Sequence, residues 1–452
     1  MKEPERGAGS SLRTVPGPKS KALHERERAV IAPGLQQIAQ LSQLVFVEGR
    51  GRHLRDADDN EYLDFFAGVA VASLGHAHPR FVAALQEQVA RLAVGSFTTP
   101  QRVRLLELIA ELAPGDLRRT QLYSGGAEAV EAAIRLAKSH TKKFEVVGFW
   151  GGFHGKTGGV MGLIGDPWKQ HWGPLAVGTH LLPYADCYHC PFQLRYPQCG
   201  MHCLDFVRSS LKATTAGAIA AIVVEPMQGT AGNIVPPPEF LPGLATIAAE
   251  NDALLIADEM ITGFGRTGKP FGCDHTGVVP DVMTIGKGLG SGFPVSGLVT
   301  NDAVAAAEPF SKPSSSSSSF GGNPLAATAA CTTIETIVDE DLAGNAERVG
   351  GWMLGELRKL QEKYPFIGDV RGVGLLIGVE LVTDRATKEP LPRDACELVF
   401  REALRRGLLV MSYGARIRIH PPLTLTESEA RDGVAILDEA FTVLNRSGLA
   451  PA

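Results

Sequence analysis

Residues 253–294 read ALLIADEMITGFGRTGKPFGCDHTGVVPDVMTIGKGLGSGFP and contain two short apolar runs, each followed by a residue of distinct chemistry. The first run, Ala253–Ala257, ends in Asp258, and the second, Val282–Ile285, is followed by Lys287. Short apolar runs bounded by glycine, proline or charge are typical of buried strands in a parallel sheet. Ligands of such sheets bind beyond the carboxyl ends of the strands. The stretch therefore predicts an α/β domain in which this aspartate and this lysine lie at one sheet edge.

Two further apolar runs extend the predicted sheet. Val146–Phe149 comes shortly before Phe153 and His154, and Ala221–Val224 ends in Glu225. Because these residues also follow strand ends, we expect them at the same edge as the aspartate and the lysine. That edge would then present a lysine, two carboxylates and an aromatic ring.

A predicted helix over Ala127–His140 adds an anion-binding group to this edge. Val130, Ile134 and Ala137 share one face of the helix, as expected for a helix that packs on a sheet. Two glycines precede the helix and allow the backbone to turn tightly into it. The free N–H groups of a helix start favour a phosphate or another anion.

This combination matches the chemical requirements of pyridoxal 5'-phosphate (PLP). The cofactor needs a lysine for its aldehyde, an acidic partner for its pyridine nitrogen, a helix start for its phosphate and apolar packing for its ring. Asp258 suits the nitrogen because a carboxylate with a pKa of about 3.9 stays ionised beside a cation. Gly286 and Gly288 flank Lys287 and leave space for a cofactor against the backbone.

Seven segments resemble, in order and spacing, the motifs of class III (ω-amino acid type) PLP-dependent aminotransferases. They are Tyr123–Lys138, Gly152–Thr157, Glu225–Gly229, Leu255–Gly268, Thr284–Pro294, Phe320–Ala326 and Arg418–Leu423. The resemblance extends from about residue 30 to about residue 445. It implies the PLP-dependent transferase fold type I, with a large α/β/α domain, a mainly parallel sheet and a smaller α+β domain.

The resemblance also implies roles for individual residues. Lys287 would form the Schiff base and carry protons, and Asp258 would pair with the pyridine nitrogen. Phe153 and Met260 would cover the two faces of the ring. The implied cofactor-binding residues are Gly125, Gly126, Ala127, Phe153, His154, Glu225, Asp258, Met260, Lys287 and Ser319. The implied substrate-binding residues are Arg418, Val69 and Thr230.

One implied role concerns a second copy of the chain. Ser319 stands where the family usually has a threonine, and it would reach the phosphate in the partner subunit. This role implies a homodimer with shared active sites, and a tetramer stays an open alternative.

The implied reaction is transfer of an amino group from an amino acid or ω-amino compound to an α-oxo acid, pyruvate or 2-oxoglutarate, by a ping-pong mechanism. An amino-acid racemase or epimerase of the same fold is the main alternative, because a cysteine-rich insert resembles segments of members described as amino-butyrate transaminases or racemases. Decarboxylation is disfavoured, since Val69 replaces a polar glutamine of the decarboxylase pattern. A non-enzymatic binding protein would leave the lysine and the aspartate without a role.

Two positions depart from the common family pattern. Ile261 stands where many members have a glutamine that touches the ring hydroxyl. Thr230 stands where amino-butyrate and ornithine enzymes have a glutamate that masks the arginine. Because threonine carries no charge, we expect Arg418 to stay open for a substrate carboxylate.

The insert carries four of the seven cysteines, as Cys187-x2-Cys190-x8-Cys199-x3-Cys203. Four thiolates at this spacing are able to bind a structural zinc ion. Disulfides are disfavoured in a reducing cytosol, and buried thiols are the third interpretation. Nothing links the insert to the PLP constellation, so no metal is expected in the active site.

Composition excludes several other classes of protein. The net charge is −5, with 44 Lys and Arg against 49 Asp and Glu, so we expect no nucleic-acid partner and no anionic membrane partner. No apolar run approaches the roughly 18 residues that span a bilayer. The polar N-terminus lacks the apolar core of a signal peptide, which favours a cytoplasmic location. Its first 20 or so residues read as a flexible arm.

We expect three segments along the chain. Residues 1–64 form the N-terminal arm and part of a small domain, residues 65–324 the large PLP-binding domain, and residues 325–452 the C-terminal small domain. The expected elements of the last segment are helices at Leu325–Asp339, Glu347–Lys363, Pro392–Arg406 and Glu427–Asn445, and strands at Val373–Leu381 and Ala415–His420.

Overall fold

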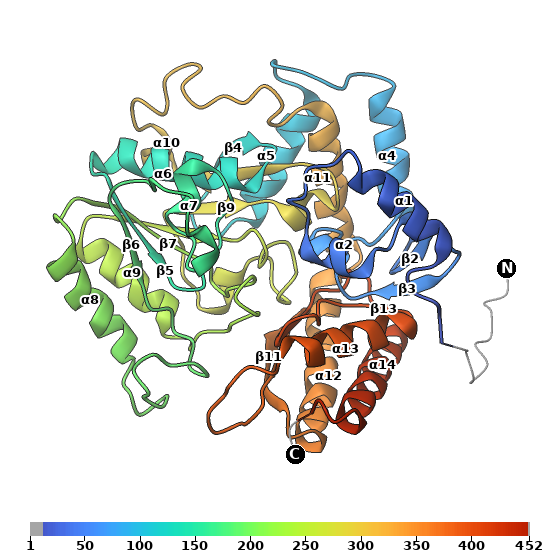
Figure 1. The fold of residues 1–452 in the computed structure, drawn as a ribbon. Helices are drawn as coiled ribbons and strands as arrows, with labels where there is room; N and C mark the ends of the chain where they lie inside the picture. The colour runs from blue at the N-terminus through green and yellow to red at the C-terminus, as the bar shows by residue number, and fades with distance from the viewer. Residues whose placement is uncertain (1–11, 451–452) are drawn as a thin grey trace.

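A computed structural model describes residues 12–450 and has a seven-stranded sheet at its centre (Figure 1). The strand order is β4-β10-β9-β8-β7-β5-β6, and β10 is antiparallel to both of its neighbours, whereas all other pairs are parallel. The strands are β4 (Arg119–Tyr123), β5 (Glu145–Phe149), β6 (Thr179–Leu182), β7 (Ile219–Val224), β8 (Leu254–Asp258), β9 (Val282–Ile285) and β10 (Ser296–Thr300). The mainly parallel α/β sheet predicted from the sequence is confirmed, and each of its four predicted strands is present.

Helices cover both faces of this sheet, because successive side chains of a buried strand point to opposite faces. Val223 packs in a cluster with α6 (Gly126–Thr141), whereas Ile222 packs in the cluster that includes α8 (His202–Thr214) and α9 (Phe240–Glu250). Figure 1 shows α6 on one side of the strands and α8 and α9 on the other. All six residues of β7 are buried, and each buried valine or isoleucine stabilises the fold by about 1.5–3 kcal/mol.

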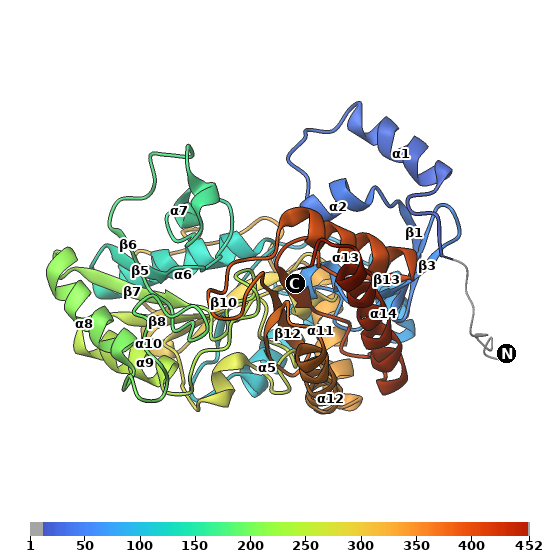
Figure 2. The same cartoon turned by 60° about the horizontal axis from the view of Figure 1, so that its bottom comes forward.

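A smaller sheet joins the two ends of the chain. Its strand order is β1-β2-β3-β13, and β13 runs parallel to β3 (Figures 1 and 2). The strands are β1 (Phe46–Arg50), β2 (His53–Asp56), β3 (Glu61–Asp64) and β13 (Leu408–Leu409). Because an N-terminal and a C-terminal strand pair directly, we propose that the described parts of residues 1–64 and 325–452, namely 12–64 and 325–450, form one small domain beside the large domain of residues 65–324.

A third sheet corrects one expectation from the sequence. Val373–Leu381 was predicted as a single strand, but this region contains two antiparallel strands, β11 (Ile367–Val373) and β12 (Leu376–Leu381). Gly374 lies in the turn between them with φ +57°, a left-handed conformation that glycine adopts without strain. The apolar run continues across this turn, so the hydrophobic pattern of the sequence does not reveal the break between the two strands. β14 (Arg416–Ile419) pairs with β12 and completes the sheet.

The predicted arm also needs correction where the structure describes it. Helix α1 begins at Pro18, inside the segment predicted to be flexible, and the carboxylate of Asp58 accepts hydrogen bonds from the amides of Lys19 and Ser20 at 2.8 Å each. This cap lies about 40 positions along the chain, so local sequence does not reveal it. Residues 1–11 lie outside the described residues.

The four helices predicted for the C-terminal segment are present as α11 to α14, although α12 starts five residues before the predicted Glu347. Its N-cap is Asp341, which accepts a hydrogen bond from the Gly344 amide at 3.2 Å. The longer helices are α1 (Pro18–Arg28), α2 (Gln37–Ser42), α4 (Pro79–Val89), α5 (Pro100–Leu112), α11 (Pro324–Asp339), α12 (Leu342–Lys363), α13 (Arg393–Arg405) and α14 (Glu427–Arg446). The short ones are α3 (Ala67–Ala70), α7 (Gly158–Met161), α10 (Asp302–Ala305) and the 3-10 turns Pro167–Lys169, Gly272–His275 and Lys287–Gly290. Within residues 12–450, no helix combines the length and apolar character needed to cross a membrane.

The cysteine-rich insert lies between β6 and α8. All seven cysteines are free thiols, so the insert contains no disulfide. Its four cysteines line one small cavity of about 20 Å³, together with aromatic side chains. The described part of the chain has no group of three or more His, Cys, Asp or Glu side chains that could hold a metal ion. Burial raises the pKa of the Cys203 thiol, which favours the protonated form.

Candidate active site

A cavity of about 410 Å³ lies beyond the carboxyl ends of β8 and β9, next to the start of α6. Its wall contains five of the side chains predicted to gather there, namely Phe153, His154, Asp258, Met260 and Lys287. The volume falls within the range of about 300–1,000 Å³ that is usual for small-molecule sites. The structure therefore brings side chains from three separate segments of the chain to one place, beside the start of α6.

The first turn of α6 supplies the backbone amides of the cavity. Gly126 and Ala127 belong to its wall. The first N–H groups of a helix have no partner within the helix, and they carry the positive end of its dipole. The Gly125 amide donates to the carboxylate of Glu128 at 2.7 Å, so it already has a partner. This leaves the next two amides as the natural donors to an anion.

Asp258 is buried and is held by three hydrogen bonds. His154 Nδ1 lies 2.6 Å from Asp258 Oδ2, while Thr284 Oγ1 and the Met260 amide donate to Oδ1 at 2.9 and 3.2 Å. Burial alone would raise the pKa of Asp258. The hydrogen bond and charge of His154, together with the charge of Lys287, outweigh burial and hold that pKa below its ordinary value. The carboxylate is thus kept anionic at the bottom of the cavity.

The same pairing shifts the pKa of His154 upward. Its ring is buried, and burial alone would lower its pKa, but the hydrogen bond and the charge of Asp258 raise it. Thr284 was not predicted from the sequence. It lies opposite Asp258 in the β8–β9 register, and a threonine within an otherwise apolar strand was the available signal.

Glu225 positions the loop that carries Phe153 and does not line the cavity. Its two carboxylate oxygens accept hydrogen bonds from the amides of Phe153 and Gly229, both at 3.0 Å. Burial raises the pKa of Glu225, and the charge of His154 opposes that rise. Glu225 therefore links the segment after β5 to the segment after β7, and it lies outside the cavity wall.

Lys287 has a left-handed backbone, with φ +42°. This conformation costs a residue with a side chain about 1–3 kcal/mol and is typical of functional sites. Its glycine neighbours are required by space, because a Cβ on Gly286 would come within 2.6 Å of Met260 Sδ and one on Gly288 within 2.7 Å of Ser73 Oγ. Burial lowers the pKa of Lys287, while the charges of Asp258 and Glu225 oppose this effect. A lowered pKa increases the fraction of neutral, nucleophilic amine.

Arg418 lies on β14, outside the wall of this cavity, but its charge contributes to the lowered pKa of Lys287. Its side chain is half-buried and is hydrogen-bonded to Tyr413. Burial lowers the pKa of Arg418, and the tyrosine opposes this. Within residues 12–450, no carboxylate forms an ion pair with this guanidinium, in agreement with the absence of charge at Thr230, whose side chain is exposed.

Two other predicted residues lie outside the cavity wall. Val69 sits in a left-handed turn, with φ +67°, and packs beside Tyr413 in the apolar cluster of the small sheet. Val71, two residues later, is the valine that lines the cavity. Ser319 is exposed on the loop before α11.

The sequence did not predict several other residues of the wall. They are Val71, Ser124, Gly155, Gly292, Phe293, Pro294 and Val295. Most of them lie inside the quoted motifs, but their contact with the cavity depends on loop conformation. The four requirements of PLP are nevertheless met by residues of one cavity: a lysine, an anionic partner, helix amides, and apolar side chains for the ring.

Comparison with known proteins identifies the family. The family pattern described as Aminotransferase class-III matches residues 36–441. The chain belongs to the class III aminotransferase family. Members of this family are PLP-dependent enzymes of fold type I, so this aminotransferase uses PLP and moves amino groups.

Individual relatives cover nearly the whole aminotransferase chain. It is 35% identical to leucine/methionine racemase of Thermococcus litoralis, over 88% of this chain and 90% of the relative. It is 34% identical to acetylornithine aminotransferase of Methanothermobacter thermautotrophicus, over 94% of this chain and 100% of the relative. Among solved structures, an amine transaminase from an uncultivated Pseudomonas species in its PLP-bound form is 32% identical, with a TM-score of 0.85 over 91% of this chain and 98% of that one.

Proposed function

We propose that this enzyme transfers the amino group of an α-amino acid or an ω-amino compound to pyruvate or 2-oxoglutarate, with Lys287 as the cofactor-binding lysine. The observation that supports this most strongly is the convergence of Lys287 with the buried Asp258–His154 pair on one cavity that also contains helix amides. The aminotransferase family membership supplies the reaction class.

In this proposal each residue has a defined task. PLP, when bound, supplies an electron-accepting ring that stabilises negative charge on the substrate carbon. Asp258, kept anionic by His154, pairs with the ring nitrogen, and the amides of Gly126 and Ala127 hold the phosphate. Nζ of Lys287 takes the proton from the substrate carbon that bears the amino group and returns it elsewhere on the reacting system.

The substrate is proposed to present a carboxylate to Arg418. A half-buried guanidinium with no anionic partner among residues 12–450 is well suited to a carboxylate, which it can bind through two parallel hydrogen bonds. Since Thr230 leaves this charge unmasked, α-amino and α-oxo acids such as alanine and pyruvate are favoured in both half-reactions. Amines without a carboxylate are expected to be poor donors.

Replacing Arg418 by lysine should raise the KM for the oxo acid by about tenfold, because the two-pronged contact is lost while the charge remains. Steady-state kinetics with pyruvate would measure the change. Arg416→Lys is a matched control on the same strand, where the side chain pairs with Glu380 and is not proposed to contact substrate. Equal KM values for the Arg418→Lys enzyme and the wild type would refute the assignment.

The second candidate function is racemisation of an amino acid. It is supported by the likeness to a leucine/methionine racemase, which is as extensive as the likeness to aminotransferases. The two reactions can be told apart by their use of the oxo acid, because amino transfer consumes it whereas inversion of an amino acid does not.

A panel of amino donors against pyruvate and 2-oxoglutarate, with chiral analysis, tests the proposed function. We expect the wild-type enzyme to convert the oxo acid into an amino acid in step with loss of the donor. Interconversion of D- and L-amino acids at a rate that does not depend on the oxo acid would show a racemase instead. A strong preference for amines without a carboxylate would contradict the substrate class.

We further propose that the active unit is a homodimer. Ser319 is exposed, and its neighbour Phe320 is 62% exposed, as is another aromatic side chain, Phe97, at 82%. Exposed aromatic side chains such as these are available for contact with another chain. A second copy would bring Ser319 towards the phosphate site of its partner.

Mixed dimers provide the test of this arrangement. Ser319→Asp should repel the phosphate, so that its homodimer is nearly inactive, as is the homodimer of Lys287→Ala. Co-refolding the two variants in equal amounts should recover about one quarter of the wild-type activity, because half of the dimers then contain one intact site. Separate inactive homodimers that never complement each other would contradict the shared site.

A further inference from the structure

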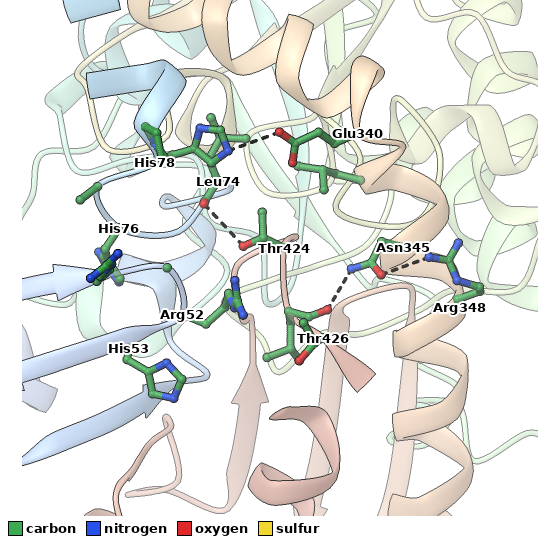
Figure 3. Close-up of a pocket in the computed structure, with 16 residues that line it drawn as sticks. Arg52, His53, Leu74, His76, His78, Glu340, Asn345, Arg348, Thr424 and Thr426 are labelled. Carbon is green, nitrogen blue, oxygen red and sulfur yellow. Dashed lines mark hydrogen bonds and ion pairs between the residues drawn. The ribbon is translucent and has the colours of Figure 1, made fainter. Parts of the chain in front are cut away.

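A second cavity, of about 590 Å³, is lined in part by the segment between β3 and α4, which carries Leu74, His76 and His78 (Figure 3). Strands β1 and β2, the segment before α4, the start of α12 and the segment before α14 form its walls. It shares no lining residue with the cavity that contains Lys287. Its volume is within the range of about 300–1,000 Å³ that is usual for small-molecule sites, and the proposed transfer reaction gives it no role.

Cationic side chains predominate in the wall of this second cavity. Three arginines and three histidines line it, against one carboxylate, that of Glu340. Arg52 is already neutralised, since its guanidinium binds both oxygens of Glu429 at 2.8–3.0 Å. Arg50, at the end of β1, and Arg348, on α12, are exposed arginines that reach the cavity from different walls.

Arg348 is directed by a neighbour on its own helix. Its Nη2 donates to Oδ1 of Asn345 at 3.2 Å, and the amide nitrogen of Asn345 donates in turn to the carbonyl oxygens of Leu423 and Leu425 at 2.7 and 2.9 Å. Figure 3 shows Asn345 and Arg348 on the side opposite His53 and His76. The arginine is thus tied to the wall, while most of its guanidinium hydrogens stay available.

The nearest carboxylates are already engaged. Asp341 caps α12 through the Gly344 amide and lies 3.8 Å from Arg348, a distance that allows only a weak ion pair. Glu429 caps α14 through the Thr426 amide while it binds the guanidinium on β2. These acids lower the positive potential of the cavity without occupying it.

Two histidines of the cavity wall lie beside carboxylates. His76 Nε2 is 2.8 Å from the buried carboxylate of Asp64, and His78 Nε2 is 3.4 Å from Glu340. The second ring nitrogen of His78, Nδ1, is buried and has no hydrogen-bond partner among residues 12–450. An unpaired buried polar atom in a cavity wall is a position where a ligand or water restores a hydrogen bond.

We propose that this cavity binds a small polyanion with at least two anionic groups, contacted by Arg50 and Arg348 from different walls. Guanidinium groups bind phosphates and carboxylates through paired hydrogen bonds, so both chemistries satisfy the site. The site is separate from the transfer reaction and its anion is not the PLP phosphate, because the two cavities have different walls.

Calorimetric titration of the PLP-saturated enzyme tests this proposal, since the phosphate site of the cofactor is then filled. Inorganic pyrophosphate and citrate are the probes, at constant ionic strength, and acetate is the monovalent comparison. We expect saturable binding of at least one of the two polyanions, and the stronger one identifies phosphate or carboxylate chemistry. Binding of neither polyanion, or of acetate with equal strength, would overturn the proposal.

Two variants on one helix make the test specific. Arg348→Gln should weaken polyanion binding by about tenfold, because one of the paired contacts is lost. Arg358→Gln removes the same charge from an exposed position of α12 that is outside the cavity, and should leave the affinity unchanged. Equal weakening in both variants would show non-specific attraction to the surface and would contradict the assigned site.

Discussion

Lys287→Ala is expected to lose about 10³–10⁴-fold in turnover and all of the visible absorbance of lysine-bound PLP. The variant removes the amine that holds the cofactor covalently and that moves the proton, and a positioned acid–base group alone contributes about 10²–10⁴-fold. The surrounding fold should persist, because the cavity wall is otherwise intact. Absorbance spectra and single-turnover kinetics of the purified variant measure the two losses.

A small primary amine provides a sharper readout for the same variant. Methylamine enters a cavity of this volume and should restore part of the proton transfer in Lys287→Ala, as an unattached lysine would. Lys269→Ala, at an exposed position of a neighbouring loop, is the control and should behave like the wild type. Unchanged turnover in Lys287→Ala would remove the basis of the proposed mechanism.

Asp258→Asn is expected to lower turnover by about 10²–10³-fold, the usual effect of removing one preorganised electrostatic group from an active site. The asparagine can still accept a hydrogen bond from Thr284, but it carries no charge to pair with the ring nitrogen. The substitution also removes the charge that raises the pKa of His154, so this histidine should become neutral at a lower pH than in the wild type. Pre-steady-state kinetics and an NMR titration of His154 measure these effects.

Asp281→Asn is the matched control for this prediction. Asp281 precedes β9, at the end of the strand opposite the cavity, and accepts a hydrogen bond from the Leu255 amide at 2.8 Å. Its replacement should affect the thermal stability more than the chemistry. Asp258→Asn with wild-type turnover, or Asp281→Asn with an equal loss, would contradict the role of Asp258.

The sequence predicts the centre of the fold well because the central strands are buried on both faces. The run before Asp258 is apolar, the run before Lys287 is apolar except for Thr284, both are buried, and parallel strands place their ends together. In contrast, β10 (Ser296–Thr300) contains serine, glycine and threonine, so it lacks the apolar pattern although all five residues are buried. The sequence therefore did not predict β10, the strand that is antiparallel to both of its neighbours.

The site was predicted where its residues lie at the ends of strands or shortly after them. Asp258 is the last residue of β8 and His154 lies in the loop after β5, and they meet at 2.6 Å as their positions imply. Val71 and the loop Gly292–Val295 were not predicted as wall residues, because they follow irregular segments. Where such a segment runs depends on left-handed residues such as Val69 and on distant partners, which periodicity does not encode.

The same limit applies to contacts between distant parts of the chain. The carboxylate of Asp58 caps a helix that begins at Pro18, and the short strand Leu408–Leu409 pairs with Glu61–Asp64. Neither contact leaves a local signal in the sequence. Such tertiary contacts are decided by three-dimensional packing rather than by propensity.

Chemical trapping of the cofactor on its lysine tests the central claim most directly. Borohydride reduction of the purified enzyme makes the bond between PLP and its lysine permanent, and peptide mass spectrometry then identifies the modified residue. The proposed mechanism predicts one pyridoxyl group per chain, on Lys287, and its loss when an amino donor is added before reduction. A pyridoxyl group on another lysine, or none on a fully active enzyme, would contradict it.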